Sequence, residues 1–392
     1  MQRTPLRLAL RVLIILIPFV GLVACSSSSP SDAPDAAPES VCPPEENFHG
    51  TLDPEIFEYD YSCTGEIPPT GVAPNAAPPS EDCSAGIWPD LDPIVEVCPT
   101  FSETTRFDPD SNMTLPPVDT RRLPYEMDVS ESGSYLVDPP AVFPSRVKVV
   151  AWNMKYTSQL DEQINTLTTH PDLSDADVYL LSEVDRCSER NGTRRAARLL
   201  AEAIGGDYVY AIEFVELNID RSTGGDTGQA IISRRPLSGA RTTCHSQQEE
   251  WFTSSDEPRL GQRVALHADL PAGDTSIRVN ALHFESADIF GEKRVAQVKE
   301  LLDQAQLSAC DRPQIIGGDF NTWYCAAPEL EVLRKSGYED ALRTVGDIEP
   351  THNNGLRLDY VWSRGLRVID GGVARDVTTS DHSPLWVVLE VD

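Results

Sequence analysis

The sequence predicts an α/β protein in which packed sheets are enclosed by helices. From about residue 145 onward, short apolar runs rich in β-branched residues alternate with segments whose apolar residues recur at helical spacing. Strand-like runs outnumber the helical ones, which favours sheets that pack on each other with helices outside. Apolar residues make up 40% of the chain, enough to fill such a core.

Residues 26–144 differ in composition from the rest of the chain. They hold 21 of the 31 prolines and 23 acidic residues against three arginines. We therefore expect a Pro-rich acidic region over 42–144 that buries little, followed by a compact domain over 145–392. The net charge of −30 repels phosphate backbones, which argues against a protein built for tight, non-specific binding of nucleic acid.

An export signal is expected at residues 1–24. Three arginines precede an apolar run, 12–23, that is about half the length needed to span a bilayer. The run ends in Leu22-Val23-Ala24-Cys25, which resembles the lipobox of bacterial lipoproteins; an ordinary signal peptide that contains a cysteine is the alternative. A serine-rich tether, 25–41, follows. We expect an exported chain that a lipid on Cys25 anchors in the bacterial cell envelope, at the outer membrane.

Cysteine usage fits an exported chain. The nine cysteines without Cys25 leave eight, an even number with no C-x-x-C pair, which favours disulfides over metal thiolates. Four of the eight lie within 42–144, where we expect them to staple a loop-rich module. The sequence does not select among the possible pairings.

The elements of the main domain follow from its apolar patterns. We expect strands at 147–152, 178–182, 230–233, 264–268, 277–282, 315–318, 358–362 and 386–391. Helical spacing marks two helices, around 160–167 and 196–203, with Ser158 and Thr193 as candidate caps. Two more helices are expected near 291–306 and 328–336; Pro328 begins the last one and Gly337 follows its end.

Polar residues recur at the ends of these strands. Singly, each is most simply a cap or a turn residue. If the strand ends converge, the residues form one polar pocket on an apolar scaffold. They are Asn153, Glu183, His283, Asp319, Asn321, Asp359, Asp381 and His382.

Such a pocket is suited to metal-assisted hydrolysis. Carboxylate and amide oxygens suit a hard cation such as Mg²⁺, or Mn²⁺ or Ca²⁺. Histidines without a nucleophilic Ser or Cys motif favour acid–base work on water. The chain has no P-loop, dinucleotide fingerprint, G-x-S-x-G or H-E-x-x-H, so those enzyme classes lack their signatures.

Residues 145–392 resemble the endonuclease/exonuclease/phosphatase superfamily. The matching motifs appear in the family's order, among them Leu181-Ser182-Glu183-Val184-Asp185, Gly317-Gly318-Asp319-Phe320-Asn321 and Ser380-Asp381-His382-Ser383-Pro384. The resemblance implies a four-layer α/β sandwich with two packed mixed β-sheets. It also implies a metal-dependent phosphoesterase.

The resemblance assigns a role to each residue of the pocket. Glu183 is similar to the principal metal ligand, with Asn153 beside it and Asp381 completing the site. Asp319 would orient or deprotonate the attacking water, and Asn321 would hold a phosphate oxygen. His382 would pair with Asp359, and His283 would face the phosphate.

Three further residues have open interpretations. His283 has no partner fixed by the sequence, although Glu285 shares its face if the strand continues. His352 either lines the pocket or lies on the surface. Trp251 either touches lipid or a base, or forms a small satellite core.

The expected function is hydrolysis of a phosphate diester at the cell envelope. The substrate is a phosphate ester, either nucleic acid as for a nuclease or a phospholipid head group as for a sphingomyelinase. The lipid anchor would tie the enzyme to a membrane, and no protein partner is evident. A catalytically inactive binding or adhesion lipoprotein with the same fold is the alternative.

Overall fold

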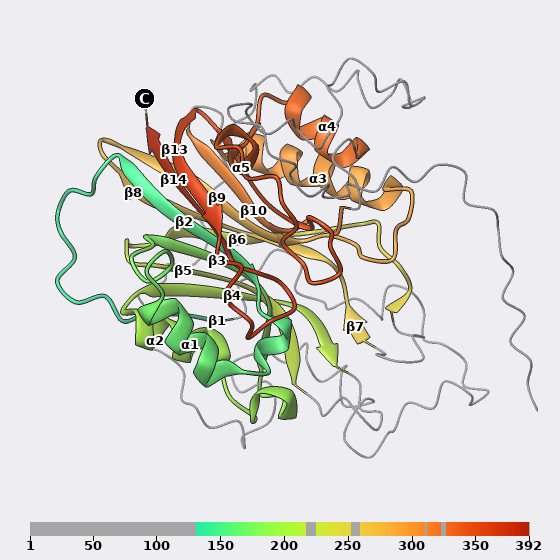
Figure 1. Ribbon diagram of the computed structural model, residues 1–392, viewed down its shortest axis with the longest axis horizontal. Helices are drawn as coiled ribbons and strands as arrows, with labels where there is room; N and C mark the ends of the chain where they lie inside the picture. The colour runs from blue at the N-terminus through green and yellow to red at the C-terminus, as the bar shows by residue number, and fades with distance from the viewer. Residues whose placement is uncertain (1–130, 217–224, 252–258, 310–311, 323–326, 392) are drawn as a thin grey trace, which may run out of the picture. The chain divides into compact units, whose positions relative to one another are not determined.

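The computed structural model describes residues 131–391, apart from 217–224, 252–258, 310–311 and 323–326 (Figure 1). Two mixed β-sheets pack face to face, and helices cover the outer face of each sheet. This is the expected four-layer α/β arrangement. The export signal, the tether and most of the Pro-rich region lie outside the described residues.

The first sheet has eight strands within the described part of the chain. Its order is β1-β4-β5-β3-β2-β14-β13, with β7 paired to β4, and only the β2–β3 pair is parallel. The bounds are β1 Glu131–Ser134, β2 Arg146–Asn153, β3 Val178–Arg186, β4 Asp207–Glu216, β5 Asp226–Ser233, β7 Arg259–Gly261, β13 Leu366–Val373 and β14 Leu385–Val391.

The second sheet has six strands among the described residues. Its order is β11-β12-β10-β9-β8-β6, and β9 and β10 run parallel. The bounds are β6 Ser238–Cys244, β8 Val264–Ala272, β9 Thr275–His283, β10 Gln314–Asp319, β11 Glu339–Asp340 and β12 Asp359–Arg364.

The helices divide between the two outer faces. The first sheet is covered by α1 (Leu160–Thr169) and α2 (Ala196–Ile204), and the second by α3 (Glu292–Ala309) and α4 (Pro328–Lys335). Short α5 (Ala341–Thr344) adds Ala341 and Leu342 to the core between the sheets. Figure 1 shows these two helical layers on opposite sides of the strands.

Alternation along the strands produces three apolar cores. In β2, Val149 and Ala151 point to the core between the sheets, while Val150 and Trp152 point to α1 and α2. The sheets come very close at Gly317 of β10. A Cβ there would lie 2.8 Å from Leu180 Cδ1 of the facing sheet, so an alanine at 317 would force the Leu180 side chain to shift.

The sequence located most core elements but not their ends. All eight expected strands and four expected helices are present. The strands β1, β4, β6, β7, β11 and β13 were not expected. Neither candidate cap is correct: α1 and α2 begin after Gln159 and Arg195, which make no side-chain cap, and Ser158 follows the 3-10 turn Lys155–Thr157 instead.

Strand β1 lies before the expected start of the domain at residue 145. It pairs with β4, and Glu131 places its carboxylate among buried partners. Arg195 Nη1 donates to Glu131 at 2.7 Å and the hydroxyl of Tyr208 donates at 2.9 Å. The folded domain therefore includes residues from 131 onward.

Two other predictions concern parts of the chain outside the described residues. Cys25 and six of the eight remaining cysteines lie there, so the lipid anchor and the disulfides stay predictions. Within the described residues, no helix has the length and apolar character needed to cross a membrane.

Candidate active site

Three adjacent strands of the second sheet bring three of the predicted residues into one row. In the register of β10, Asp319 pairs with His283 on β9 and with Asp359 on β12. Neighbouring strands lie about 4.8 Å apart, so these side chains share one end of the sheet. The convergence of strand ends expected from the sequence is present here.

Glu183 enters the site through an irregularity in the first sheet. It does not end a strand, as we expected, but lies inside β3, where the register with β5 shifts between Leu181 and Val184. Its φ of 51° is in the left-handed region, which costs about 1–3 kcal/mol for a residue with a side chain. A β-bulge of this kind re-aims a side chain, and here it turns the carboxylate toward the second sheet.

Asn153, the last residue of β2, joins the two sheets. Its Nδ2 donates to Glu183 Oε1 at 3.1 Å and to Asp319 Oδ2 at 3.0 Å. Its Oδ1 accepts the backbone N–H of Lys155 at 3.0 Å, which fixes the orientation of the amide. One buried amide thus sets the distance between the two carboxylates.

His382 forms the expected pair with Asp359. His382 Nδ1 lies 2.8 Å from Asp359 Oδ2, which also accepts the Thr351 hydroxyl at 2.7 Å. Burial acts to lower the pKa of His382, but the carboxylates of Asp359 and Asp319 outweigh it and raise the pKa to about 10. Burial raises the pKa of Asp359, while His382 opposes that shift. We assign the proton to the imidazole, because Asp319 also attracts it.

His283 has a partner that the sequence did not reveal. Its Nδ1 lies 3.5 Å from Oε2 of Glu213, a residue in the middle of β4 that is 1% exposed. Burial alone raises the pKa of Glu213, but Arg263 and His283 outweigh it and lower the pKa to about 2. Glu285, the candidate from the sequence, instead accepts from Trp251 Nε1 at 3.1 Å.

Asp319 lies between the two histidines. Its Oδ2 is 3.7 Å from His283 Nε2 and 3.7 Å from His382 Nε2. Its Oδ1 accepts the backbone N–H of Asn321 at 2.8 Å, and Asn321 donates through Nδ2 to the carbonyl of Phe284 at 3.0 Å. Asn321 has a φ of 48°, a strained conformation held by these two bonds.

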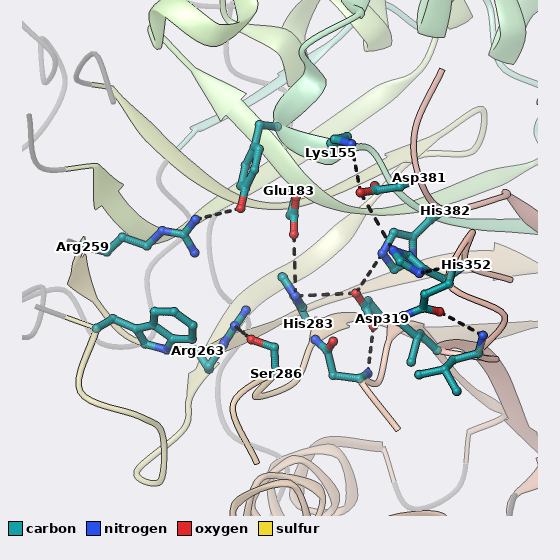
Figure 2. Close-up of a pocket in the computed structure, with 16 residues that line it drawn as sticks. Lys155, Glu183, Arg259, Arg263, His283, Ser286, Asp319, His352, Asp381 and His382 are labelled. Atoms are coloured by element: carbon teal, nitrogen blue, oxygen red, sulfur yellow. Dashed lines mark hydrogen bonds and ion pairs between the residues drawn. The ribbon is translucent and has the colours of Figure 1, made fainter. Parts of the chain in front are cut away.

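Asp381 lies on the side of the site away from Arg259 and Arg263, next to Lys155 and His352 (Figure 2). Its Oδ2 is 3.0 Å from Lys155 Nζ and 3.9 Å from His352 Nε2. Burial acts to raise the pKa of Asp381, but Lys155 and His382 lower it overall. His352 therefore lines the site, the first of the two interpretations open from the sequence.

These residues surround a cavity of about 480 Å³ (Figure 2). Six of the eight predicted residues line it, and Asn153 and Asp359 lie directly behind them. In Figure 2, Glu183 and His283 lie between Arg259 and Arg263 on one side and Asp381 and His352 on the other. The lining residues that the sequence did not single out are Lys155, Tyr156, Arg259, Arg263, Ser286, Asn354, Leu356 and Leu358.

The turn after β2 has an unusual backbone. Lys155, Tyr156 and Thr157 all have positive φ values, between 47° and 59°. Such conformations are costly for residues with side chains and cluster at functional sites. The turn carries both Lys155 and Tyr156 to the cavity. The tripeptide Lys155–Thr157 contains no glycine, so the sequence did not predict a turn with positive φ values here.

The donor set fits a hard divalent cation. Glu183 and Asp381 offer carboxylate oxygens, the ligand type that Mg²⁺ and Ca²⁺ prefer, while Asn153 lies behind the lining and its amide orients Glu183. Two sets of His and carboxylate ligand atoms lie within 4.8 Å of one another among the described residues: His352 with Asp381 and His382, and Asp319 with Asp359 and His382.

A family model described as Endonuclease/Exonuclease/phosphatase family matches residues 150–382, more than half of the chain. The chain belongs to this family. Members of the Endonuclease/Exonuclease/phosphatase family are hydrolases that act on phosphate esters and generally depend on a divalent metal ion. The fold of the family, α/β with two mixed β-sheets, is the fold described above for this chain. No curated protein matches the chain.

Solved structures with the same kind of fold are distant in sequence. The human Nocturnin catalytic domain with bound sulfate is 19% identical, with 63% of this chain and 94% of that chain covered and a TM-score of 0.49. A humanized D. rerio TDP2 is 17% identical, with 63% and 100% covered and a TM-score of 0.46. An endonuclease/exonuclease/phosphatase from Beutenbergia cavernae is 18% identical, with 63% and 72% covered and a TM-score of 0.45.

Proposed function

We propose that the protein is a metal-dependent phosphodiesterase that hydrolyses a phosphate diester by direct attack of water. The observation that carries the proposal is the position of Asp319, whose Oδ2 lies 3.7 Å from the Nε2 atoms of both His283 and His382. A carboxylate flanked by two imidazoles provides a base for water and donors for a phosphate in one place.

Each side chain has a chemical task in this reaction. Asp319 orients the attacking water and accepts its proton. His382, kept cationic by Asp359, donates a hydrogen bond to the phosphate and opposes the charge that develops on it. His283, held through its Nδ1 by Glu213, presents Nε2 to the phosphate or to the leaving oxygen. Asn321 donates to a phosphoryl oxygen when it exchanges its bond to the carbonyl of Phe284.

A divalent cation fits beside these groups. Glu183 and Asp381, with Asn153 orienting Glu183, would hold Mg²⁺, Mn²⁺ or Ca²⁺, which would neutralise charge on the phosphoryl oxygens. Asp381 already has Lys155 as a cationic partner at 3.0 Å. Glu183 has Asn153 Nδ2 at 3.1 Å and His283 Nε2 at 4.0 Å, but no lysine or arginine among the ion pairs of the described residues, so it is the carboxylate more open to a metal.

The test uses the full-length protein with Mg²⁺ and the substrate bis(4-nitrophenyl) phosphate. Turnover is measured as the rate at which 4-nitrophenol is released. We expect hydrolysis that is lost in excess EDTA, restored by added metal, and reduced by roughly 10²–10⁴-fold in Asp319→Asn. Full turnover in EDTA would contradict the metal dependence. No turnover on any phosphate diester would instead favour an inactive binding or adhesion protein.

We also propose that the enzyme works at the bacterial cell envelope. The motif Leu22-Val23-Ala24-Cys25 and the serine-rich tether support a lipid on Cys25, and the apolar run before it supports export. Mass spectrometry of the mature chain tests the proposal. Cleavage before an acylated Cys25 is expected, and an unmodified Cys25 would indicate an exported protein without the anchor.

A further inference from the structure

Three lysine or arginine side chains line the cavity within the described part of the chain: Lys155, Arg259 and Arg263. Buried acids hold both arginines. Arg259 Nε lies 3.2 Å from Oε1 of Glu216, and Arg263 Nη1 pairs with Oε1 of Glu213. The arginines are 5% and 1% exposed, so neither side chain turns readily toward a phosphate in the cavity. Of the three, Lys155 is therefore the cation that a substrate is able to engage.

Lys155 is held differently from the arginines. Its side chain is 47% exposed, and its Nζ lies 3.0 Å from Oδ2 of Asp381, a side chain that is 26% exposed (Figure 2). An ion pair this open to water is weak, so it exchanges easily. Asp381 is also one of the two carboxylates that we expect to hold the divalent cation. Two cations at one carboxylate repel each other, so Lys155 competes with a metal ion for Asp381.

The backbone of Lys155 is fixed although its side chain is not. All three residues of the turn Lys155–Thr157 have φ values between 47° and 59°, in the left-handed region. Such conformations persist only where the surroundings determine them, and they cluster at functional sites. Met154, just before the turn, is fully buried, and its carbonyl accepts from Gln163 Nε2 at 2.7 Å. The N–H of Lys155 donates to Asn153 Oδ1 at 3.0 Å, so the turn is anchored at its start.

Tyr156 anchors the middle of the same turn. The Cζ atoms of Arg190 and Arg259 lie 3.9 Å and 5.5 Å from the centroid of its ring, which are cation–π distances. Arg259 Nη2 also donates to the Tyr156 hydroxyl at 2.8 Å. Glu216 pairs with both arginines, at 3.0 Å and 3.2 Å. These contacts fix the ring, so the neighbouring Lys155 always extends from the same point of the cavity wall.

We propose that Lys155 is a further catalytic residue: its ammonium neutralises Asp381 in the metal-free protein, and it binds a phosphoryl oxygen once a divalent cation engages that carboxylate. The inference rests on the proposed phosphodiesterase activity and adds a residue to it. An ammonium on a flexible stem is a mobile point charge with three donors, which suits a phosphate. Ligand atoms of Asp381 and His382 lie within 4.8 Å of each other, so a phosphate that His382 contacts lies close to this ammonium.

The exchange predicts that the metal ion and the phosphate help each other to bind, in part through Lys155. A divalent cation at Asp381 displaces the ammonium, which becomes available to a phosphate, and a phosphate that binds the ammonium leaves Asp381 open to the cation. Such a coupling is reciprocal and is visible in equilibrium binding without any turnover. Removal of the ammonium should therefore have opposite effects on the two ligands.

The experiment is isothermal titration of the full-length protein with Mg²⁺ alone, and with inorganic phosphate at saturating Mg²⁺. Lys155→Met keeps most of the stem and removes the charge. It should bind Mg²⁺ roughly two- to fivefold more tightly than wild type, because an exposed ion pair is a weak competitor. It should bind phosphate roughly tenfold or more weakly, because a charge-assisted hydrogen bond is lost. Lys155→Arg keeps the charge and should restore part of the phosphate affinity.

Lys335→Met is the matched control. Lys335 is 48% exposed in its side chain and pairs with Glu331, which is 28% exposed, at 3.6 Å, but it does not line the cavity. The control has the same change in net charge and should leave both dissociation constants unchanged. Thermal unfolding checks that each variant is folded, and Lys155→Gln takes the place of Lys155→Met if the methionine variant does not fold.

Unchanged phosphate affinity in the uncharged variant would overturn the contact between Lys155 and the phosphate. Unchanged or weaker Mg²⁺ binding would overturn the exchange at Asp381. In both cases the wild type could still hydrolyse bis(4-nitrophenyl) phosphate, and the proposed function would stand. If no diester is hydrolysed but both binding effects are present, the proposed function fails and Lys155 belongs to a metal-coupled phosphate-binding site. The two failures are therefore distinguishable.

Discussion

His382 Nδ1 and Asp359 Oδ2 lie 2.8 Å apart in a buried pair. The pair connects β12 of the second sheet to the loop before β14. The carbonyl of His382 also accepts the indole N–H of Trp152 at 2.9 Å, so the backbone of this histidine is fixed from the apolar core. The pair acts as one unit, and its members should not contribute independently.

The first prediction concerns this unit. Asp359→Asn should lower kcat/KM on a chromogenic phosphodiester by roughly 10²–10⁴-fold, as should His382→Ala, because each removes the stabilised imidazolium. The double variant should be scarcely worse than either single variant. Losses that multiply in the double variant would show that the two residues work separately.

The second prediction concerns Glu183 and the metal. Glu183→Gln keeps the shape of the side chain but removes a charge that attracts the cation. The Mg²⁺ concentration for half-maximal activity should rise by roughly tenfold or more. The free energy of unfolding without metal should not fall, since Glu183 lies near the carboxylate of Asp319, with Asn153 between them. An unchanged Mg²⁺ requirement would exclude Glu183 as a principal ligand.

The third prediction concerns stability as a function of pH. The pKa of Glu213 is lowered in the folded state to about 2 from a usual 4.5, so its ionised form stabilises the fold. That contribution is complete above about pH 4.5 and is lost as the pH falls toward 2. The free energy of unfolding of wild type minus Glu213→Gln should be constant above pH 5 and shrink below it.

An exposed acid provides the control for that measurement. Glu390 pairs with Arg146 at the surface, 3.2 Å away, and such pairs are worth about 0–1 kcal/mol. Glu390→Gln should change the free energy of unfolding only slightly. A difference for Glu213→Gln that stays constant down to pH 3 would contradict the assigned pKa. Glu213→Gln should also reduce turnover, because Glu213 holds His283.

The fourth prediction concerns the start of the domain. Glu131→Ala removes the carboxylate that accepts from Arg195, a side chain only 1% exposed. Leaving a buried charge without its partner costs about 3–5 kcal/mol. Urea unfolding of the full chain should show a loss of this size, whereas Ser132→Ala in the same strand should change little. A loss below about 1 kcal/mol would show that β1 is not part of the stable fold.

Local pattern predicted the residues of the site better than the contacts between them. Asn153, His283 and Asp319 each follow or end an apolar run, so composition along the chain was enough to find them. Glu213 lies inside β4, where nothing local separates it from its neighbours, and its partner His283 is 70 residues away in sequence. Such a pair is visible only once the topology is known.

Other errors have the same origin. The sequence predicted a strand end at Glu183, because a polar residue there follows an apolar run. The strand instead continues through an irregularity in its pairing with β5. Helix caps were assigned from residue type, but the chain enters α1 through a strained turn and α2 through Arg195, which the buried Glu131 holds. For Glu183 and for the start of α2, a contact with a residue distant in sequence accompanies the local conformation.

The amide of Asn153 makes the chemistry sensitive to the separation of the two sheets. It joins Glu183 of one sheet to Asp319 of the other at 3.1 and 3.0 Å, while a Cβ on Gly317, two residues before Asp319, would press on the Leu180 side chain of the facing sheet. Close-packed interiors transmit such strain instead of absorbing it. Moderate hydrostatic pressure, or Gly317→Ala deep in the core, should therefore alter turnover at conditions where the protein is still folded.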